Sequence, residues 1–345
     1  MGASTLMRLG RVILAMLAMC GLLAVLSACS SFQPSNAKAN APLSAEAKSR
    51  LVAIGSEPGA PMLVRIFKQS SELEIWKQSK NGEFKLFKTY EICAWSGGLG
   101  PKVVEGDRQS PEGIYSITPG LMNPNSNYYL AFNTGFPNKF DRAHGRTGSN
   151  LMVHGDCSSR GCYSMTDASI AEIYAMARET FIGGNKSFQL QIFPFRMTVA
   201  NLSKVAKDPN IDFWQSIKPA YDRFELSKAP TNWDVCEGRY VIDVPEGMVL
   251  DAKGRCPQAV ASLSPDLAAK AAADAVLIAE AALRLDKRAA QAATEAEKLA
   301  AAQAAAKVRG ETISGFFGGL LGGIGGGEID PSIDPVVPAP RPNRG

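Results

Sequence analysis

The composition of the chain changes abruptly at Ser264, and this change limits the part that can form a globular core. Residues 264–311 are mostly Ala, Lys, Glu, Arg, Gln and Leu, and they begin with Ser-Pro-Asp, a helix start with a cap, a proline and an acid in the first turn. We therefore expect a long alanine-rich helix there, either a single solvated helix or a weak coiled coil. Residues 312–345 are rich in Gly and Pro and predict a low-complexity tail.

Residues 1–28 have the pattern of a lipoprotein signal peptide. Two arginines precede an apolar run that is too short, with the wrong flanks, for a membrane-spanning helix. The run ends in Leu-Ser-Ala before Cys29, which resembles a lipobox, so we expect cleavage before Cys29 and lipidation of its thiol. Ser30 resembles the signal for sorting to the outer membrane. An ordinary signal peptide and an uncleaved anchor are the alternatives, and residues 29–42 predict a flexible tether.

The charge balance gives no indication of nucleic acid as a partner. The whole chain carries a net charge of +4, and removal of residues 1–28, which hold two arginines and no acid, lowers it to +2. A chain so close to balance lacks the basic excess that binds nucleic acid.

Residues 43–258 contain the patterns of one mainly β domain with a few helices, a mixed α+β fold. The expected strands are 62–67, 73–78, 84–90, 113–117 and 189–195, and the expected helices are 44–54, 167–181 and 203–226. Asn81-Gly82 between two alternating runs is a strong hairpin signal. Residues 121–143 show weak periodicity and predict a long loop over a cleft.

The stretch 144–167 holds both histidines of the chain and two of its seven cysteines, Cys157 and Cys162. A cysteine nucleophile needs a base, backbone N–H groups for the oxyanion and a turn that exposes the sulfur. The apolar residues before His154 predict a buried strand that ends at this histidine, and Gly161 precedes Cys162 in an expected tight turn with a helix after it. In this interpretation His154 takes the thiol proton and stabilises the thiolate, while the N–H groups of Gly161 and Cys162 hold the oxyanion.

Other roles for these cysteines are open. Cys162 can instead be buried or disulfide-bonded, and Cys157 can be a resolving thiol, a disulfide partner of Cys93 or a buried thiol. Cys236 and Cys256 flank a short strand and can pair in an oxidising compartment. Zinc is the rival for a group of one histidine and two cysteines, but the sequence offers no C-x-x-C and no strong fourth ligand, so we expect no metal and no cofactor.

The residues HG at 154–155 and S-R-G-C at 159–162 resemble the signature of the L,D-transpeptidase (YkuD-like) catalytic domain family of bacterial cell-wall enzymes. In that family HG is followed, after a spacer, by S/T-H-G-C. The short spacer and the sequence CYSMTD resemble the YafK-type branch. The resemblance covers roughly residues 45–250 and implies a β-sandwich catalytic domain. This chain has Arg160 where most of the family has histidine, and Tyr-Ser at 163–164 replaces the usual apolar-Arg pair.

The resemblance implies an enzyme of cell-wall biogenesis and cell shape that attacks peptidoglycan stem peptides at meso-diaminopimelate and forms an acyl-enzyme at Cys162. An amine acceptor gives an L,D-crosslink or attaches a lipoprotein, and water gives hydrolysis, including release of peptidoglycan-bound lipoprotein. The acceptor stays open. The implied site has Cys162 and His154 as catalytic residues, Gly161 and Ser159 for the oxyanion and orientation, and Arg160, His144 and Tyr163 for substrate binding.

The implied location is the periplasmic face of the cell envelope, as an outer-membrane lipoprotein of a Gram-negative bacterium. A non-enzymatic function is the alternative: a lipid-anchored, peptidoglycan-binding spacer in which the alanine-rich helix is the working part. Replacement of Cys162 separates the two hypotheses, because a binding protein would keep its function.

Overall fold

The computed structural model describes residues 37–260 and 262–318, with side chains up to residue 310. The predicted signal peptide, the lipobox with Cys29 and the tail beyond residue 318 lie outside the described residues. Within the described ranges, no helix combines the length and the apolar character that crossing a bilayer requires.

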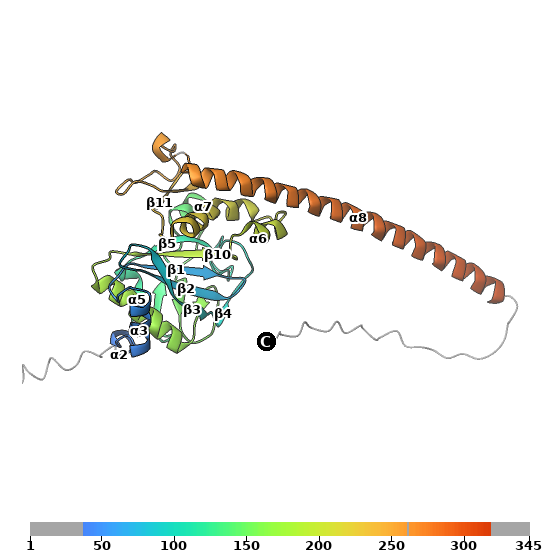
Figure 1. The fold of residues 1–345 in the computed structure, drawn as a ribbon. Coiled ribbons are helices and arrows are strands. Elements are labelled where there is room, and N and C mark those ends of the chain that lie inside the picture. Colours follow the sequence, from blue (N-terminus) through green and yellow to red (C-terminus); the bar gives the residue numbers. More distant parts are fainter. Residues whose placement is uncertain (1–36, 261, 319–345) are drawn as a thin grey trace, which may run out of the picture. The chain divides into compact units, whose positions relative to one another are not determined.

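Sheet A has five strands in the order β3-β2-β1-β10-β5 and consists of the strands expected from the sequence (Figure 1). Their bounds are β1 Met62–Phe67, β2 Glu72–Gln78, β3 Phe84–Glu91, β5 Gly113–Ile117 and β10 Phe188–Phe193. The predicted hairpin joins β2 to β3, and Gly82 in its turn has a φ of +91°, which glycine adopts without strain. β1 pairs in parallel with β10 and is buried along its whole length, so it forms the centre of the sheet.

Sheet B has five short strands in the order β4-β9-β8-β7-β6. Their bounds are β4 Ala94–Trp95, β6 Met122–Asn123, β7 Ala131–Asn133, β8 Met152–His154 and β9 Tyr163–Ser164. β8 and β9 run parallel, whereas the other neighbouring strands are antiparallel.

Sheet B corrects two sequence predictions. Residues 121–143 are not one long loop, because they contain β6, β7 and the short helix α4 (Lys139–Ala143). Cys162 is followed by β9 rather than directly by a helix, and the next helix, α5 (Asp167–Ile182), is capped by Thr166. Strands of two or three residues are too short to show a period in the sequence.

One hydrophobic core is shared by sheet A, sheet B and the helices α3 and α5. α3 spans Ala45–Ala53 and begins at the expected cap Ser44, whose hydroxyl accepts a hydrogen bond from the Ala47 N–H. The core includes Leu51 of α3, Val64 of β1, Ile75 of β2, Val153 of β8 and Ile173 of α5. This arrangement confirms the predicted mixed α+β fold built around two sheets.

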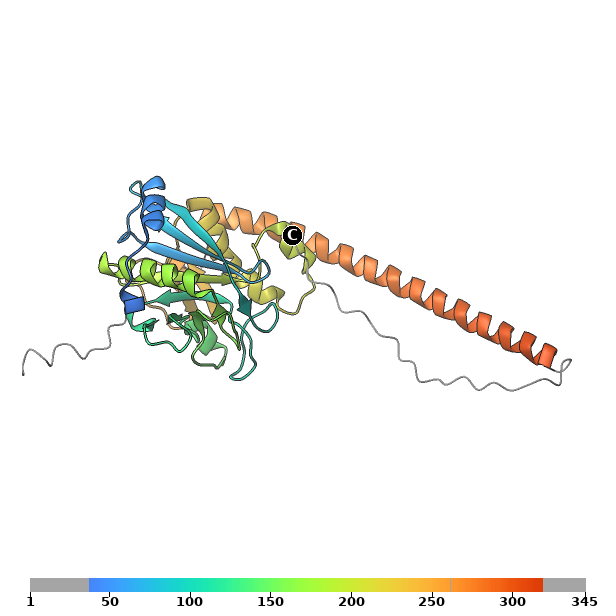
Figure 2. The same ribbon diagram turned by 90° about the horizontal axis from the view of Figure 1, so that it is seen from below.

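The opposite face of sheet A is covered by α7 (Figures 1 and 2). The single helix expected over 203–226 is two helices, α6 Val199–Lys204 and α7 Ile211–Ser227. Leu63 of β1 packs with Phe224 of α7, and the buried guanidinium of Arg65 donates a hydrogen bond to Glu225 at 2.7 Å. β1 is therefore enclosed between two layers.

The domain begins earlier than the expected boundary at residue 43. Residues 37–40 form the short helix α2 (Ala37–Asn40), although the sequence predicts a flexible tether there. Ala39 is buried in the core, and its carbonyl accepts a hydrogen bond of 2.5 Å from Arg178 of α5. These contacts attach residues 37–42 to the domain.

A separate hairpin is formed by β11 (Trp233–Cys236) and β12 (Arg239–Ile242). Cys236 and Cys256 form a disulfide, one of the pairings that the sequence left open. Two 3-10 helices complete the domain, η2 Pro119–Leu121 and η3 Gln258–Val260.

The alanine-rich helix α8 spans Pro265–Gly318, and its first turns belong to the domain. Leu267 is 1% exposed and packs with Ile114, Ala220 and Ile242. Asp274 of α8 forms an ion pair with Lys218 of α7. The compact unit that contains the domain ends at Ala282, so we place its boundary there rather than at Ser264.

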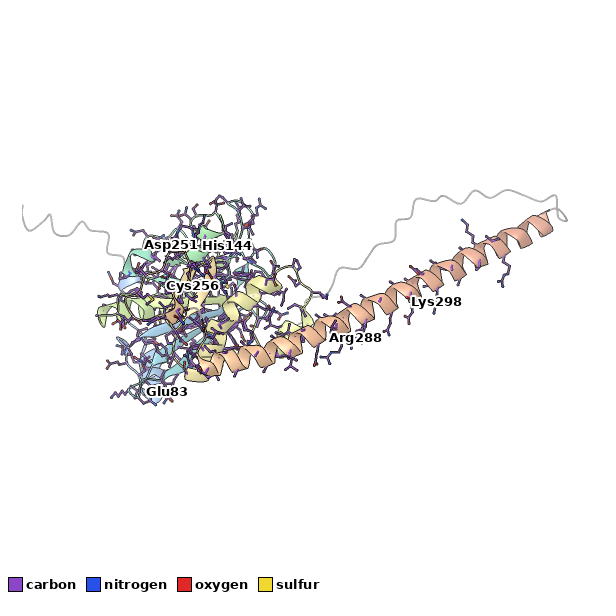
Figure 3. All side chains as sticks on the ribbon, turned by 90° about the horizontal axis from the view of Figure 1, so that it is seen from above. Glu83, His144, Asp251, Cys256, Arg288 and Lys298 are labelled. Carbon is purple, nitrogen blue, oxygen red and sulfur yellow. A yellow bond between two sulfur atoms is a disulfide. The ribbon has the colours of Figure 1, made fainter. Side chains whose placement is uncertain are left out.

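The second unit begins at Leu283 and differs from the first in the exposure of its side chains. The side chains of α8 from residue 286 to residue 310 are all exposed, and Arg288 and Lys298 project from this part of the helix (Figure 3). Such a helix has little to bury, as its composition predicts.

We expect the two possible C-terminal truncations to differ in stability. Loss of residues 283–345 should leave the melting temperature nearly unchanged, whereas loss of residues 264–345 should lower it by several degrees, because Leu267 and Asp274 are removed from the domain. A point variant isolates the effect: Leu267→Ala should cost about 2–5 kcal/mol. The control Leu283→Ala, at a position 62% exposed, should stay within about 0.5 kcal/mol of the parent. Equal melting temperatures for the two truncations would place the boundary at Ser264 instead.

Candidate active site

Sheet B presents one apolar face and one face that carries the candidate chemistry. Registered residues of neighbouring strands form rows across the sheet, and successive rows point to opposite faces. One row consists of Met122, Phe132, Val153, Tyr163 and Trp95, all of which lie in or against the hydrophobic core. The next row consists of Asn123, Ala131, His154, Ser164 and Ala94. His154 therefore lies on the face that points away from the core.

Cys162 directly precedes β9, and its Sγ lies against the start of β8. The Sγ accepts a hydrogen bond of 3.4 Å from the N–H of Met152, the first residue of β8, and donates one of 3.6 Å to the Asn150 carbonyl. The thiol is half-buried and free, whereas the other cysteines of the described residues form two disulfides. The thiol therefore lies beside the first residue of the strand that ends in His154.

The tautomer of His154 follows from its surroundings. The side chain is 3% exposed, and its Nδ1 lies 2.5 Å from the Gly155 carbonyl oxygen. Because a carbonyl oxygen only accepts, Nδ1 carries the proton, and Nε2 is left as the basic nitrogen.

The electrostatics of the site favour the neutral forms of both residues. Burial lowers the pKa of His154, although the hydrogen bond to Gly155 and the charge of Asp156 oppose this. Burial also raises the pKa of the Cys162 thiol, although the hydrogen bond from the Met152 N–H opposes this shift. Both shifts in pKa favour a thiol and a neutral imidazole in the free protein, which is the opposite direction from the expected thiolate stabilised by His154.

Two serine hydroxyls fix the backbone at Cys162. Ser159 donates to the Cys162 carbonyl at 2.7 Å, and Ser110 donates to the same oxygen at 3.0 Å. Ser159 thus orients the backbone of Cys162. Gly161 has a φ of +114°, a region that favours glycine. The N–H groups of Gly161 and Cys162 come before Tyr163, the first paired residue of β9.

A buried ion pair anchors the loop that carries Ser110. Lys68 and Glu112 lie 3.0 Å apart, and both side chains are completely buried. Lys68 also donates to the carbonyls of Gly98, Gly100 and Ser110, at 2.7, 3.2 and 3.1 Å. This network holds the glycine loop and the Ser110 loop together beside Cys162.

Tyr128 is a site residue that the sequence does not reveal. Its ring lies 4.8 Å from the imidazole of His154, centroid to centroid, and it is 48% exposed. The carbonyl of Tyr128 accepts a hydrogen bond from Gly155, and a Cβ at Gly155 would lie 3.0 Å from that oxygen. Tyr128 therefore covers His154 on the solvent side, and only the pairing of β7 with β8 brings it there.

A disulfide joins Cys157 to Cys93, and both residues are exposed. Cys157 lies in the loop between His154 and Cys162, so the bond ties this loop to the residue before β4. The pairing rules out a resolving-thiol role for Cys157 in this state. It also removes Cys157 as a zinc ligand, and the residues that the structure describes contain no group of three or more metal-ligating side chains.

Two of the predicted substrate-binding residues are not brought to the thiol. Tyr163 is completely buried on the core face, where its hydroxyl donates to the Pro111 carbonyl at 2.7 Å. The ring of His144 packs against that of Phe140, 4.1 Å between centroids, and faces Gly238 of the β11-β12 hairpin, on the side of the domain where Cys256 lies (Figure 3). Arg160, in contrast, is exposed directly beside Gly161.

Known proteins are similar to this chain over most of the domain. Residues 68–230 match the model of the L,D-transpeptidase catalytic domain, YkuD. YafK of Escherichia coli strain K12, which is named as a candidate L,D-transpeptidase, is 44% identical over 205 residues, or 59% of this chain and 80% of the relative.

Two solved structures are also similar. The helical cell shape determining protein Pgp2 of Campylobacter jejuni is 17% identical, with 55% of this chain and 79% of that chain covered and a TM-score of 0.32. Bd1075 of Bdellovibrio bacteriovorus is 15% identical, with coverage of 53% and 79% and a TM-score of 0.31. The domain match and the identity to YafK show that the chain belongs to the L,D-transpeptidase family with a YkuD catalytic domain.

Proposed function

We propose that the protein is a cysteine acyl-transfer enzyme that acts on peptidoglycan stem peptides at meso-diaminopimelate. The observation that carries the proposal is the free Cys162 thiol against the start of β8, the strand that ends in His154, whose Nε2 is left as the basic nitrogen. Membership in the L,D-transpeptidase family supports the substrate class.

The chemistry follows from the neutral resting pair. His154 Nε2 takes the proton from Cys162 Sγ as the sulfur attacks the amide carbon, and the oxyanion is held by the N–H groups of Gly161 and Cys162. The imidazolium then protonates the leaving amine, and the C–N bond breaks to leave a thioester. An amine or water attacks this thioester, and His154 again accepts and returns the proton.

The acceptor determines the product. An amine acceptor forms an L,D-crosslink, and water releases a peptidoglycan-bound lipoprotein. Arg160 is placed beside the nucleophile turn and suits bidentate hydrogen bonds to a stem-peptide carboxylate. We propose Arg160 as the substrate-binding residue of the site.

We also propose that the mature protein is anchored by a lipid at Cys29 to the outer membrane and faces the periplasm. The lipobox sequence before Cys29 supports this location. Residues 30–36 then separate the anchor from α2.

Cys162→Ala should abolish product formation from defined muropeptides, with and without attached lipoprotein, as read by mass. Arg142→Ala, an exposed change on α4, is the control and should keep full turnover. The Cys162→Ala variant should still bind isolated cell wall as the parent does, because substrate binding does not need the thiol. Products formed at the parental rate by Cys162→Ala would show that Cys162 is not the nucleophile, whereas a parent that forms no products and binds cell wall as the variant does would favour the spacer function.

The alkylation rate of Cys162 in the free protein should keep rising above about pH 8.5. The reason is the sign of the two shifts: a raised thiol pKa keeps the proton on sulfur to higher pH, and a lowered imidazole pKa keeps His154 neutral at pH 7. Peptide mass mapping after timed alkylation gives the rate at each pH. A flat rate between pH 6 and pH 8 would indicate a preformed thiolate–imidazolium pair and contradict the neutral assignment.

Cys29→Ala should abolish fatty-acyl labelling and move the protein out of the membrane fraction, because the thiol is the proposed lipid attachment point. Cys20→Ala, a cysteine within the apolar run, is the matched control and should keep both the label and the fraction. Labelling that persists in Cys29→Ala would show that the lipobox interpretation is wrong.

A further inference from the structure

Ser164 has an unpaired hydroxyl in the middle of sheet B. The residue is completely buried, and its Oγ has no hydrogen-bond partner within the part of the chain that the structure describes. A buried hydroxyl without a partner costs about 1–3 kcal/mol, so its presence calls for a reason.

The neighbours of Ser164 narrow the possible reasons. In its row across the sheet, Ser164 lies between His154 of β8 and Ala94 of β4. Cys162 directly precedes the two residues of β9. Since alanine has no polar side-chain atom, the polar side chain beside Ser164 in its row is that of the proposed base, His154, and the proposed nucleophile lies just before the same strand.

The position of Ser164 is fixed by its backbone. Its carbonyl accepts a hydrogen bond of 2.8 Å from the Cys93 N–H, and the residue is paired on both sides within the sheet. The hydroxyl can therefore rotate about the Cα–Cβ bond, but the Cβ atom that carries it cannot move away from the site.

Proton transfer between Cys162 and His154 creates two charges where burial disfavours both. Nδ1 of His154 already donates a hydrogen bond to the Gly155 carbonyl, and the Cys162 sulfur already accepts one from the Met152 N–H. A hydroxyl both donates and accepts hydrogen bonds, so it can stabilise a charged thiolate–imidazolium pair. The neutral pair does not require this hydrogen bond. We propose that Ser164 is a positioning residue whose hydroxyl hydrogen-bonds to the thiolate–imidazolium pair formed from Cys162 and His154. This inference rests on the proposed function of that pair.

A purely structural role makes the opposite prediction for stability. Ala94 and Ala131 occupy the same row, so the sheet accepts a methyl group at this level. Replacement of an unpaired hydroxyl by a methyl removes a buried polar atom and should leave stability unchanged or raise it. Stability and reactivity should therefore separate at Ser164.

The test measures the alkylation rate of Cys162 against pH, by peptide mapping of the purified full chain, together with the melting temperature. Ser164→Ala should melt at the parental temperature or above. Its alkylation rate at pH 7 should fall about tenfold, and the midpoint of its profile should rise by about one pH unit, because a hydrogen bond to the charged form is lost.

Gln191→Met is the matched control, because Gln191 in sheet A also has a buried side-chain oxygen without a partner among the described residues. Its alkylation profile should match that of the parent. A Ser164→Ala profile identical to the parental one would overturn the inference, and so would a fall in reactivity that only follows a fall in melting temperature. Failure of the proposed function looks different: His154→Ala would then leave the alkylation profile of the parent unchanged.

Discussion

The alternation of side chains across sheet B is the constraint on which the site depends. A shift of β9 by one residue against β8 would turn Tyr163 outward and Ser164 into the core. Strands of two or three residues form too few ladder bonds to secure this register alone. The additional attachments come from outside the sheet, through the two serine hydroxyls on the Cys162 carbonyl and the buried network of Lys68.

Burial acts on the charges of this domain in two ways. Lys68 and Glu112 are buried as an ion pair in which each also takes part in further hydrogen bonds, and removal of one partner from such a pair typically costs about 3–5 kcal/mol. His154 and Cys162 have fewer partners, and burial shifts the pKa of each in the direction that favours its neutral form. Burial thus acts on a fully partnered pair in the scaffold and on two sparsely partnered groups at the candidate site.

The sequence predicts the regular parts of the fold well and the packed irregular parts poorly. β2 and β3 follow from alternation and the Asn-Gly turn, and the strand that ends at His154 follows from the apolar residues before it. Tyr128 and Ser110 were not predicted as site residues, because strand pairing and a loop far along the chain bring them to the site. The first part of α8 was misjudged, since the alanine-rich composition of the whole helix gives no indication of its buried residues Leu267, Asp274, Ile278 and Ala281.

The disulfide between Cys93 and Cys157 makes the structure of the candidate site depend on the redox environment of the protein. It closes a segment of 64 residues that ends in the loop between His154 and Cys162, a restraint worth roughly 4 kcal/mol in the chain-entropy model. Reducing compartments keep such cysteines as thiols. Under reducing conditions this loop would therefore lose its bond to Cys93 and would carry a second thiol five residues before Cys162, so the form of the loop described above belongs to an oxidising environment.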